Sequence, residues 1–262
     1  MDLPIFIIDA FSDRTLAGNP AAVCPLDDWL PVPTMQAIAS EMNLSETVFF
    51  APDRQQDGFG IRWFTPTREV DLIGHATLAA GFLVLERMQP HAASVRFLSG
   101  GDELIVTRDG ASLSLEMPAL RPRHIEPPPA LARGLGRQPK AVLAAKHYLC
   151  LFDHPDEIAA MAPDMSILAA LDLPGVIVTA PATGDVDFVS RFFAPAAGVA
   201  EDPVTGSAHC TLAPYWADRL AKTTLEARQV SRRGGAMRCV IDGDRVRLTG
   251  QAVCYLEGTI TL

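Results

Sequence analysis

The stretch RWFTP at residues 62–66, followed by GHA at 74–76, has a close copy in RFFAP at 191–195, followed by GSA at 206–208. Each copy predicts a strand, a loop and the start of a helix, and the loop of the second copy is three residues longer. A chance likeness between short motifs is the alternative, but self-similarity in this order is typical of a duplicated structural unit. We therefore expect two similar halves.

A proline-rich segment separates the two copies. Residues 118–129 read PALRPRHIEPPP and hold five prolines in twelve residues. Because proline fixes φ and has no backbone N–H, this composition favours an extended linker over a helix or a central strand. We expect halves at 1–118 and 130–257, a linker at 118–130 and a last strand, 258–262, that returns to the first half. A surface loop within one domain is the alternative.

The rest of each half predicts short strands around one apolar helix. Alternating runs such as those at 61–63, 113–117 and 253–255 are typical of strands. HATLAAGFLVLERM at 75–88 is apolar on nearly every face, which predicts a helix enclosed by protein. The second helix contains Pro214, where we expect a kink or break. The predicted fold class is α+β, with two pseudo-symmetric halves that face each other across a cleft, each a curled, mainly antiparallel sheet around a central helix.

The composition argues against several partners. The 262 residues carry a formal net charge of -9, and no run of Lys or Arg is dense enough to follow a phosphate backbone, so we expect no nucleic acid. No apolar stretch approaches the ~18 to 20 residues of a membrane span. MDLPIFIIDAF at 1–11 lacks the basic start and the cleavage site of a signal peptide and predicts a first strand. We expect a cytoplasmic protein with no membrane partner.

The common cofactor and metal motifs are missing from the sequence. The five cysteines are scattered without a C-x-x-C spacing, which predicts buried thiols and no zinc or redox site. The chain also lacks the dinucleotide-binding glycine motif, the P-loop, the H-E-x-x-H motif and the G-x-S-x-G elbow. We expect neither a cofactor nor a metal.

Gly74 and Gly206 stand at the starts of the two repeated helices, each followed by a polar residue, His75 or Ser207. Glycine permits a tight turn, and the first N–H groups of a helix have no partner within it, so each start is a potential anion site. Ordinary helix capping is the alternative, because serine is a favoured N-cap residue. Two such starts at one cleft would bind a carboxylated substrate.

Two carboxylates lie near these motifs. Glu46 falls between a predicted helix that ends near Met42 and an apolar strand, where desolvation would make both of its protonation states accessible, as a proton shuttle requires. Asp202 precedes Pro203, which restrains it to an extended geometry suited to binding a substrate hydroxyl or amine. The alternatives are a solvated turn glutamate and an aspartate that only initiates the helix.

Six spaced motifs together resemble the PhzF-like (phenazine-biosynthesis) family over nearly the whole chain. They are DAF at 9–11, GNPAAV at 18–23, NLSET at 43–47, RWFTP at 62–66 with EVD at 69–71, GHAT at 74–77, and EDPVTGSA at 201–208. RQVSRRGG at 228–235 fits the same family. The resemblance implies a diaminopimelate-epimerase-like fold, a homodimer and no cofactor.

The phenazine-pathway member of this family isomerises trans-2,3-dihydro-3-hydroxyanthranilate, using a glutamate to move a carbon-bound proton. Glu46 matches that glutamate, so the resemblance implies a cofactor-independent isomerase with Glu46 as general acid/base. It implies that the substrate is a small carboxylate, cyclic and unsaturated. Its implied binding residues are Ser45, Gly74, His75, Asp202, Gly206 and Ser207.

Racemases and epimerases of the same fold use two cysteines as acid and base, one from each half. The positions before the two key glycines hold Ile73 and Thr205 here, so a two-thiol mechanism is not expected. Many family members have a cysteine before the first Gly-His, and we expect Ile73 to alter packing more than chemistry.

Two other functions stay open from the sequence. Ser207 is a candidate nucleophile for acyl transfer if His75 serves as its base, although no nucleophile elbow accompanies it. The chain is also compatible with a non-catalytic protein that binds a small carboxylate in the same cleft, because a fold does not determine a function.

Overall fold

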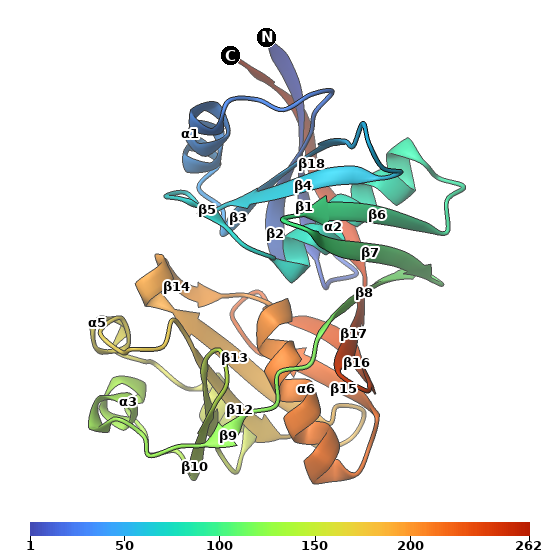
Figure 1. Cartoon of the computed structure of the whole chain (residues 1–262). Coiled ribbons are helices and arrows are strands. Elements are labelled where there is room, and N and C mark those ends of the chain that lie inside the picture. The colour runs from blue at the N-terminus through green and yellow to red at the C-terminus, as the bar shows by residue number, and fades with distance from the viewer. The chain divides into compact units, whose positions relative to one another are not determined.

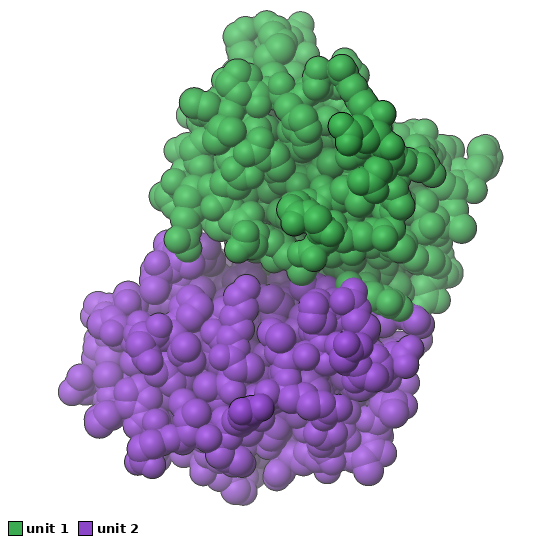
Figure 2. All heavy atoms as spheres, in the orientation of Figure 1, with its two compact units in different colours: residues 1–116, 249–262 green, residues 117–248 purple.

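The computed structural model describes residues 1–262 and divides the chain into two compact units (Figure 2). Unit 1 combines Met1–Glu116 with Thr249–Leu262, and unit 2 is Met117–Leu248. This division differs from the expected one in two ways. The C-terminal segment of unit 1 is longer than 258–262, and the proline-rich segment is part of unit 2 instead of a separate linker.

Unit 1 contains nine strands and two α-helices, the second of which ends in a π-helical turn. The strands are β1 (Asp2–Ala10), β2 (Asn19–Pro25), β3 (Glu46–Pro52), β4 (Phe59–Phe64), β5 (Glu69–Val70), β6 (Ser94–Ser99), β7 (Asp102–Asp109), β8 (Ser112–Pro118) and β18 (Ala252–Thr261). The helices are α1 (Val32–Met42), α2 (Gly74–Leu83) and the π-helical turn η1 (Val84–Met88).

The strands of unit 1 form one mainly antiparallel sheet. The hydrogen-bonded order is β18, β1, β2, β3, β4, β6, β7, β8. The short strand β5 pairs with β4 on the same edge as β6. The β2–β3 and β4–β6 pairs are parallel.

Helix α2 packs against the strands of this sheet (Figure 1) and contacts β1, β2, β3, β7 and β18. All of its residues except Phe82 are buried, which confirms the prediction of a helix enclosed by protein. At Gly81 the helix approaches β7 so closely that a Cβ atom would lie 2.5 Å from the Val106 side chain. The apolar composition of this helix therefore follows from burial on every side.

Strand β18 explains why the C-terminal segment belongs to unit 1. It pairs antiparallel with β1 from Asp2 opposite Thr261 to Ala10 opposite Ala252. Leu3 of β1 is buried and belongs to the core cluster that also holds residues of α1 and β3. The returning strand thus covers the whole length of β1, and not only its first residues.

Unit 2 repeats the same kind of fold with more short helices. Its strands are β9 (Arg123–His124), β10 (Ala141–Ala144), β11 (Tyr148–Leu151), β12 (Val176–Pro181), β13 (Phe188–Ala194), β14 (Val199–Asp202), β15 (Thr224–Gln229), β16 (Gly235–Asp242) and β17 (Arg245–Gly250). Its helices are α3 (Pro129–Leu135), α4 (Pro155–Ala159), α5 (Met165–Leu168), the 3-10 turn η2 (Pro195–Ala197) and α6 (Gly206–Leu220). Neither α6, with 15 residues, nor any shorter helix has the length and apolar character to cross a membrane.

The pairing pattern confirms the duplication. In unit 1, β3 pairs with β2 in parallel and with β4 antiparallel, and β4 also pairs with β5 and with β6. Unit 2 repeats these relations in the same order and direction. Strand β12 pairs with β11 in parallel and with β13 antiparallel, and β13 also pairs with β14 and with β15. The repeated arginines occupy the same place, since Arg62 forms a two-pronged ion pair with Glu69 and Arg191 forms one with Glu201.

Helix α6 is continuous through Pro214, so the predicted break does not occur. Proline has no N–H, which leaves the carbonyl of Cys210 without its usual partner within the helix. The N–H of Leu120, from the proline-rich segment, donates to this carbonyl at 2.8 Å. The segment therefore completes the hydrogen bonding of α6, which is why it belongs to unit 2.

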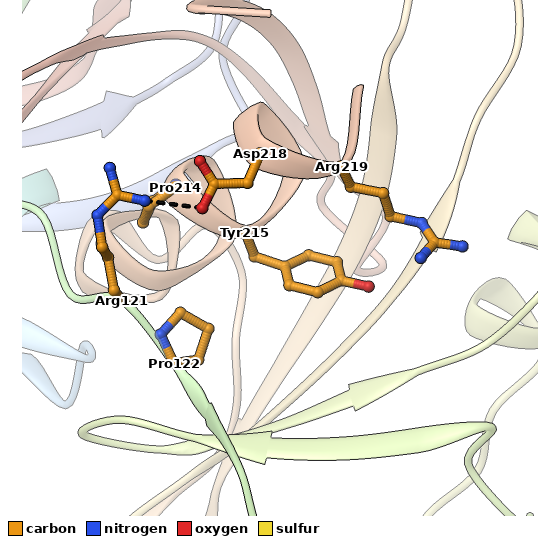
Figure 3. A pocket seen from close by; sticks show the side chains of 6 residues that line it. All are labelled: Arg121, Pro122, Pro214, Tyr215, Asp218 and Arg219. Carbon is orange, nitrogen blue, oxygen red and sulfur yellow. Dashed lines mark hydrogen bonds and ion pairs between the residues drawn. The ribbon is translucent and has the colours of Figure 1, made fainter. Parts of the chain in front are cut away.

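A pocket of about 310 Å³ lies beside this contact (Figure 3). Arg121 and Asp218 form an exposed ion pair of 2.7 Å at its edge. The lining residues are Arg121, Pro122, Pro214, Tyr215, Asp218 and Arg219. None of the predicted site residues lines this pocket.

The Leu120 contact gives a stability prediction. Leu120→Pro removes the N–H that serves the Cys210 carbonyl, and we expect it to lower the free energy of unfolding by about 1 to 3 kcal/mol. Arg121→Ala, next in the chain, breaks only an exposed ion pair, and its effect should stay below about 1 kcal/mol. Chemical denaturation of both variants measures the difference. Equal losses would contradict this role of the proline-rich segment.

Candidate functional site

Glu46 is the first residue of β3, and its side chain is buried in unit 1. The chain leaves α1 at Met42 and turns at Asn43, whose φ of 49° lies in the left-handed region that asparagine tolerates. Parallel pairing with β2 then places Glu46 beside Ala21. Because Glu46 is only 8% exposed, it is not the solvated turn glutamate that the sequence left open.

The imidazole of His75 lies next to this carboxylate. Its Nε2 atom is 3.1 Å from Oε2 of Glu46. His75 is the second residue of α2 and is 2% exposed, so the two groups meet away from bulk water. In such a low-dielectric setting a neighbouring imidazole interacts strongly with the ionised carboxylate. The structure therefore brings a carboxylate and an imidazole together at one buried place.

The start of α2 has no capping side chain. Its N-cap residue is Ile73, which has no polar side-chain atom, so Gly74 and His75 do not form an ordinary capping motif. The Thr77 hydroxyl donates to the Ile73 carbonyl at 2.7 Å. The side chain of the N-cap residue therefore leaves the positive end of the helix dipole without a capping partner.

Ser45, also predicted for the site, is partly exposed and directly precedes Glu46 in the chain.

Asp202, Gly206 and Ser207 lie together at the start of α6 in unit 2. Asp202 is the last residue of β14 and is 9% exposed, while Ser207 is partly exposed in the first turn of α6. The N-cap residue is Thr205, whose hydroxyl makes no capping bond and donates to Oδ2 of Asp202 at 2.6 Å. Like α2, α6 therefore begins without a side-chain cap.

The duplication gives Glu46 no counterpart carboxylate. Arg62 pairs with Phe49, three residues after Glu46, and Arg191 pairs with Val178, three residues after Gly175. Glu46 and Gly175 therefore occupy equivalent positions in the two units. A Cβ atom at Gly175 would lie 2.5 Å from the ring of Phe192, so this position has no room for an acidic side chain. Only the unit 1 copy of this position carries a carboxylate.

Two buried polar residues of unit 2 were not identified from the sequence. Gln229, 1% exposed, forms hydrogen bonds with both Asp202 and Thr205. His209 is fully buried, and its Nδ1 lies 2.8 Å from the Thr205 carbonyl. The sequence TLEARQ alternates Leu225 and Ala227 with polar residues, and this period predicts that Gln229 lies on the inward face of β15, although it does not reveal the contacts of its amide.

The thiols are not placed for acid/base chemistry of the two-cysteine kind. Cys24, Cys150, Cys210 and Cys239 are buried, as the sequence predicts, whereas Cys254 is only partly buried, so the prediction is wrong for that thiol. Burial raises the pKa of Cys24 and of Cys210 to about 12, so both thiols are protonated at neutral pH. The residues before the key glycines are the two N-cap residues, neither of which is a cysteine.

Comparison with known proteins assigns the chain to a class. A family model described as phenazine biosynthesis-like protein (PhzC-PhzF) matches residues 8–258. An uncharacterized isomerase of Pseudomonas aeruginosa is 48% identical over 100% of both chains. A PhzF family protein of Enterococcus faecalis is 42% identical, with a TM-score of 0.95 and 100% of both chains covered. A hydroxyproline epimerase of Agrobacterium vitis, 10% identical, shares the fold with a TM-score of 0.63 over 99% of this chain and 91% of its own.

The chain belongs to the PhzC-PhzF, or phenazine biosynthesis-like, family. It is an enzyme of the isomerase class with an α+β, epimerase-like fold. The family, the fold class and the enzyme class predicted from the sequence are confirmed.

Proposed function

We propose that the protein moves a carbon-bound proton within a small carboxylated, cyclic and unsaturated substrate similar to trans-2,3-dihydro-3-hydroxyanthranilate. Glu46 is the general acid/base, and no cofactor takes part. The observation that carries the proposal is the buried Glu46 carboxylate with the His75 imidazole 3.1 Å away. A carboxylate that is largely shielded from water is able to take a proton from a C–H bond and to keep that proton until it is returned to the substrate.

One carboxylate is sufficient for the reaction. The ionised Glu46 takes a proton from a substrate carbon, and the electron pair of the broken C–H bond delocalises into the adjacent unsaturated system. The protonated Glu46 then returns the proton to a different carbon, so atoms and charge balance without an oxidant or reductant. The glycine at the counterpart position, Gly175, supports a path with a single acid/base group.

The remaining site residues have binding roles in this proposal. The start of α2, at Gly74, supplies N–H groups and partial positive charge for a substrate carboxylate. We keep as predictions that Ser45, Asp202, Gly206 and Ser207 contact the same substrate. The homodimer and the cytoplasmic location also stay predictions.

Acyl transfer from Ser207 receives less support. A serine nucleophile needs a base within hydrogen-bond reach. The structure gives the Ser207 hydroxyl no hydrogen bond to a side chain of unit 2, and the Nε2 atom of His75, the base that the sequence suggested, lies 3.1 Å from the Glu46 carboxylate. Full activity of Ser207→Ala would eliminate this function.

Incubation of the purified protein with trans-2,3-dihydro-3-hydroxyanthranilate, followed by chromatography of the products, tests the proposal. Conversion without any added cofactor is the expected result. If this compound is not converted, a panel of small unsaturated carboxylates is tested for deuterium exchange that depends on Glu46. Tight binding without exchange of any compound would contradict the proposal and indicate a non-catalytic carboxylate-binding protein.

A further inference from the structure

Every polar atom of Thr205 is engaged by a buried neighbour. Its N–H donates to the side-chain oxygen of Gln229 at 2.9 Å, and its carbonyl accepts from Nδ1 of His209 at 2.8 Å. Its hydroxyl lies 2.6 Å from Oδ2 of Asp202 and 3.2 Å from the amide nitrogen of Gln229. Thr205, the N-cap residue of α6, is therefore held in one orientation.

The donor and acceptor types fix the direction of these bonds. The amide nitrogen of Gln229 only donates, so the Thr205 hydroxyl oxygen accepts from it. The hydroxyl proton is then left for Asp202, whose Oδ2 must be an acceptor. The second proton of the Gln229 amide goes to the main-chain carbonyl of Asp202 at 2.7 Å. Gln229 thus binds the backbone of Asp202 directly and its carboxylate through Thr205.

This chain of bonds has two consequences for the start of α6. The Thr205 hydroxyl oxygen accepts from the Gln229 amide and not from a backbone N–H of the first turn, so the α6 start has no side-chain cap. The chain of bonds also gives the Asp202 carboxylate one rotamer and an acceptor role at Oδ2. Unit 1 has no equivalent chain of hydrogen bonds through an N-cap hydroxyl, because Ile73 occupies the corresponding N-cap position.

We propose that Gln229 and Thr205 are positioning residues that orient the Asp202 carboxylate for the amino or hydroxyl group of the substrate. This proposal rests on the proposed function, in which Asp202 contacts substrate. Neither residue takes part in the proton transfer by Glu46. Their effect is therefore expected on substrate affinity more than on the chemical step.

Thr179 supplies a matched control within unit 2. Its buried hydroxyl also relays two bonds, accepting from the Trp216 indole at 3.0 Å and donating to the Val189 carbonyl at 2.7 Å. Thr205→Val and Thr179→Val thus remove the same group from the same kind of buried setting. Denaturant unfolding of both variants checks that their losses of stability are similar.

The test measures binding of 3-hydroxyanthranilate, an aromatic compound with the same substituents as the proposed substrate, by isothermal titration calorimetry. We expect Thr205→Val and Gln229→Leu each to raise the Kd at least about tenfold, the effect of losing a hydrogen bond to a charged group. Thr205→Ser, which keeps the hydroxyl, and Thr179→Val should bind like the wild type. In turnover assays KM should rise more than kcat falls.

Equal affinities of the wild type and all four variants, including no measurable binding by any of them, would overturn the proposal. The same holds if Thr179→Val weakens binding as much as Thr205→Val does, because the effect would then be one of stability. Failure of the proposed function is recognised separately. In that case the wild type shows neither conversion nor deuterium exchange, or Glu46→Gln converts substrate as the wild type does, whatever the variants of Thr205 and Gln229 do.

Discussion

Glu46→Gln is expected to lower kcat by about 10²- to 10⁴-fold, the usual contribution of a general acid/base. Glutamine keeps the size and shape of the side chain but has no proton-accepting carboxylate, so the substrate C–H bond is not broken. Binding of 3-hydroxyanthranilate should change little, because the binding groups proposed above are intact. Steady-state kinetics and calorimetry measure the two quantities on the same preparation.

Glu41→Gln is the matched control for this experiment, because Glu41 lies on the exposed face of α1 only five residues away. Its kcat should equal that of the wild type. Loss of activity in both variants would indicate a general effect of charge or folding. Retention of activity in Glu46→Gln would show that another group moves the proton.

Acidification from pH 7 to pH 5 is expected to lower the free energy of unfolding by about 2 kcal/mol for each of His147 and His209. Desolvation by burial lowers the pKa of both imidazoles from 6.5 to about 4, and the charge of Lys146 adds to the effect on His147. The unfolded chain therefore binds protons below pH 6.5 that the folded chain does not bind. The stabilisation is complete above that pH and is lost as the pH falls towards 4.

Denaturant unfolding between pH 7 and 5 tests this expectation in a variant that combines His147→Leu with His209→Asn. The asparagine amide keeps a donor for the Thr205 carbonyl, and neither new side chain titrates in this range. The variant should show a much flatter dependence of stability on pH, whatever its absolute stability. His91→Asn, which alters an exposed histidine, should follow the wild type. An unchanged slope in the double variant would contradict the assignment.

The elements of the fold were predictable because their signals are local. The alternating strands and the all-apolar helix at 75–88 follow from periodicity, and the duplication follows from two short motifs in the same order. The course of α6 was not predictable in this way. Its continuity through Pro214 depends on a donor from Leu120, which is distant in the sequence and lies in a segment that resembles a linker.

The candidate site was predictable in its residues but not in its environment. The sequence motifs pointed to Glu46, His75 and Asp202, yet the burial of Glu46 depends on a left-handed turn at Asn43 and on parallel pairing with β2. The bonds that hold Asp202 come from Gln229, on another strand. Contacts between residues far apart in the chain leave no local periodic signal, so only the folded structure identifies them.

Proton NMR of the reaction in D2O is the most direct test of the proposed proton transfer. If Glu46 removes and returns the same proton, the wild type should give product in which the receiving carbon carries deuterium in only part of the molecules, because the transferred proton is partly retained. Glu46→Gln should give neither product nor exchange. Conversion by Glu46→Gln at the rate of the wild type would contradict a single-residue proton transfer by Glu46.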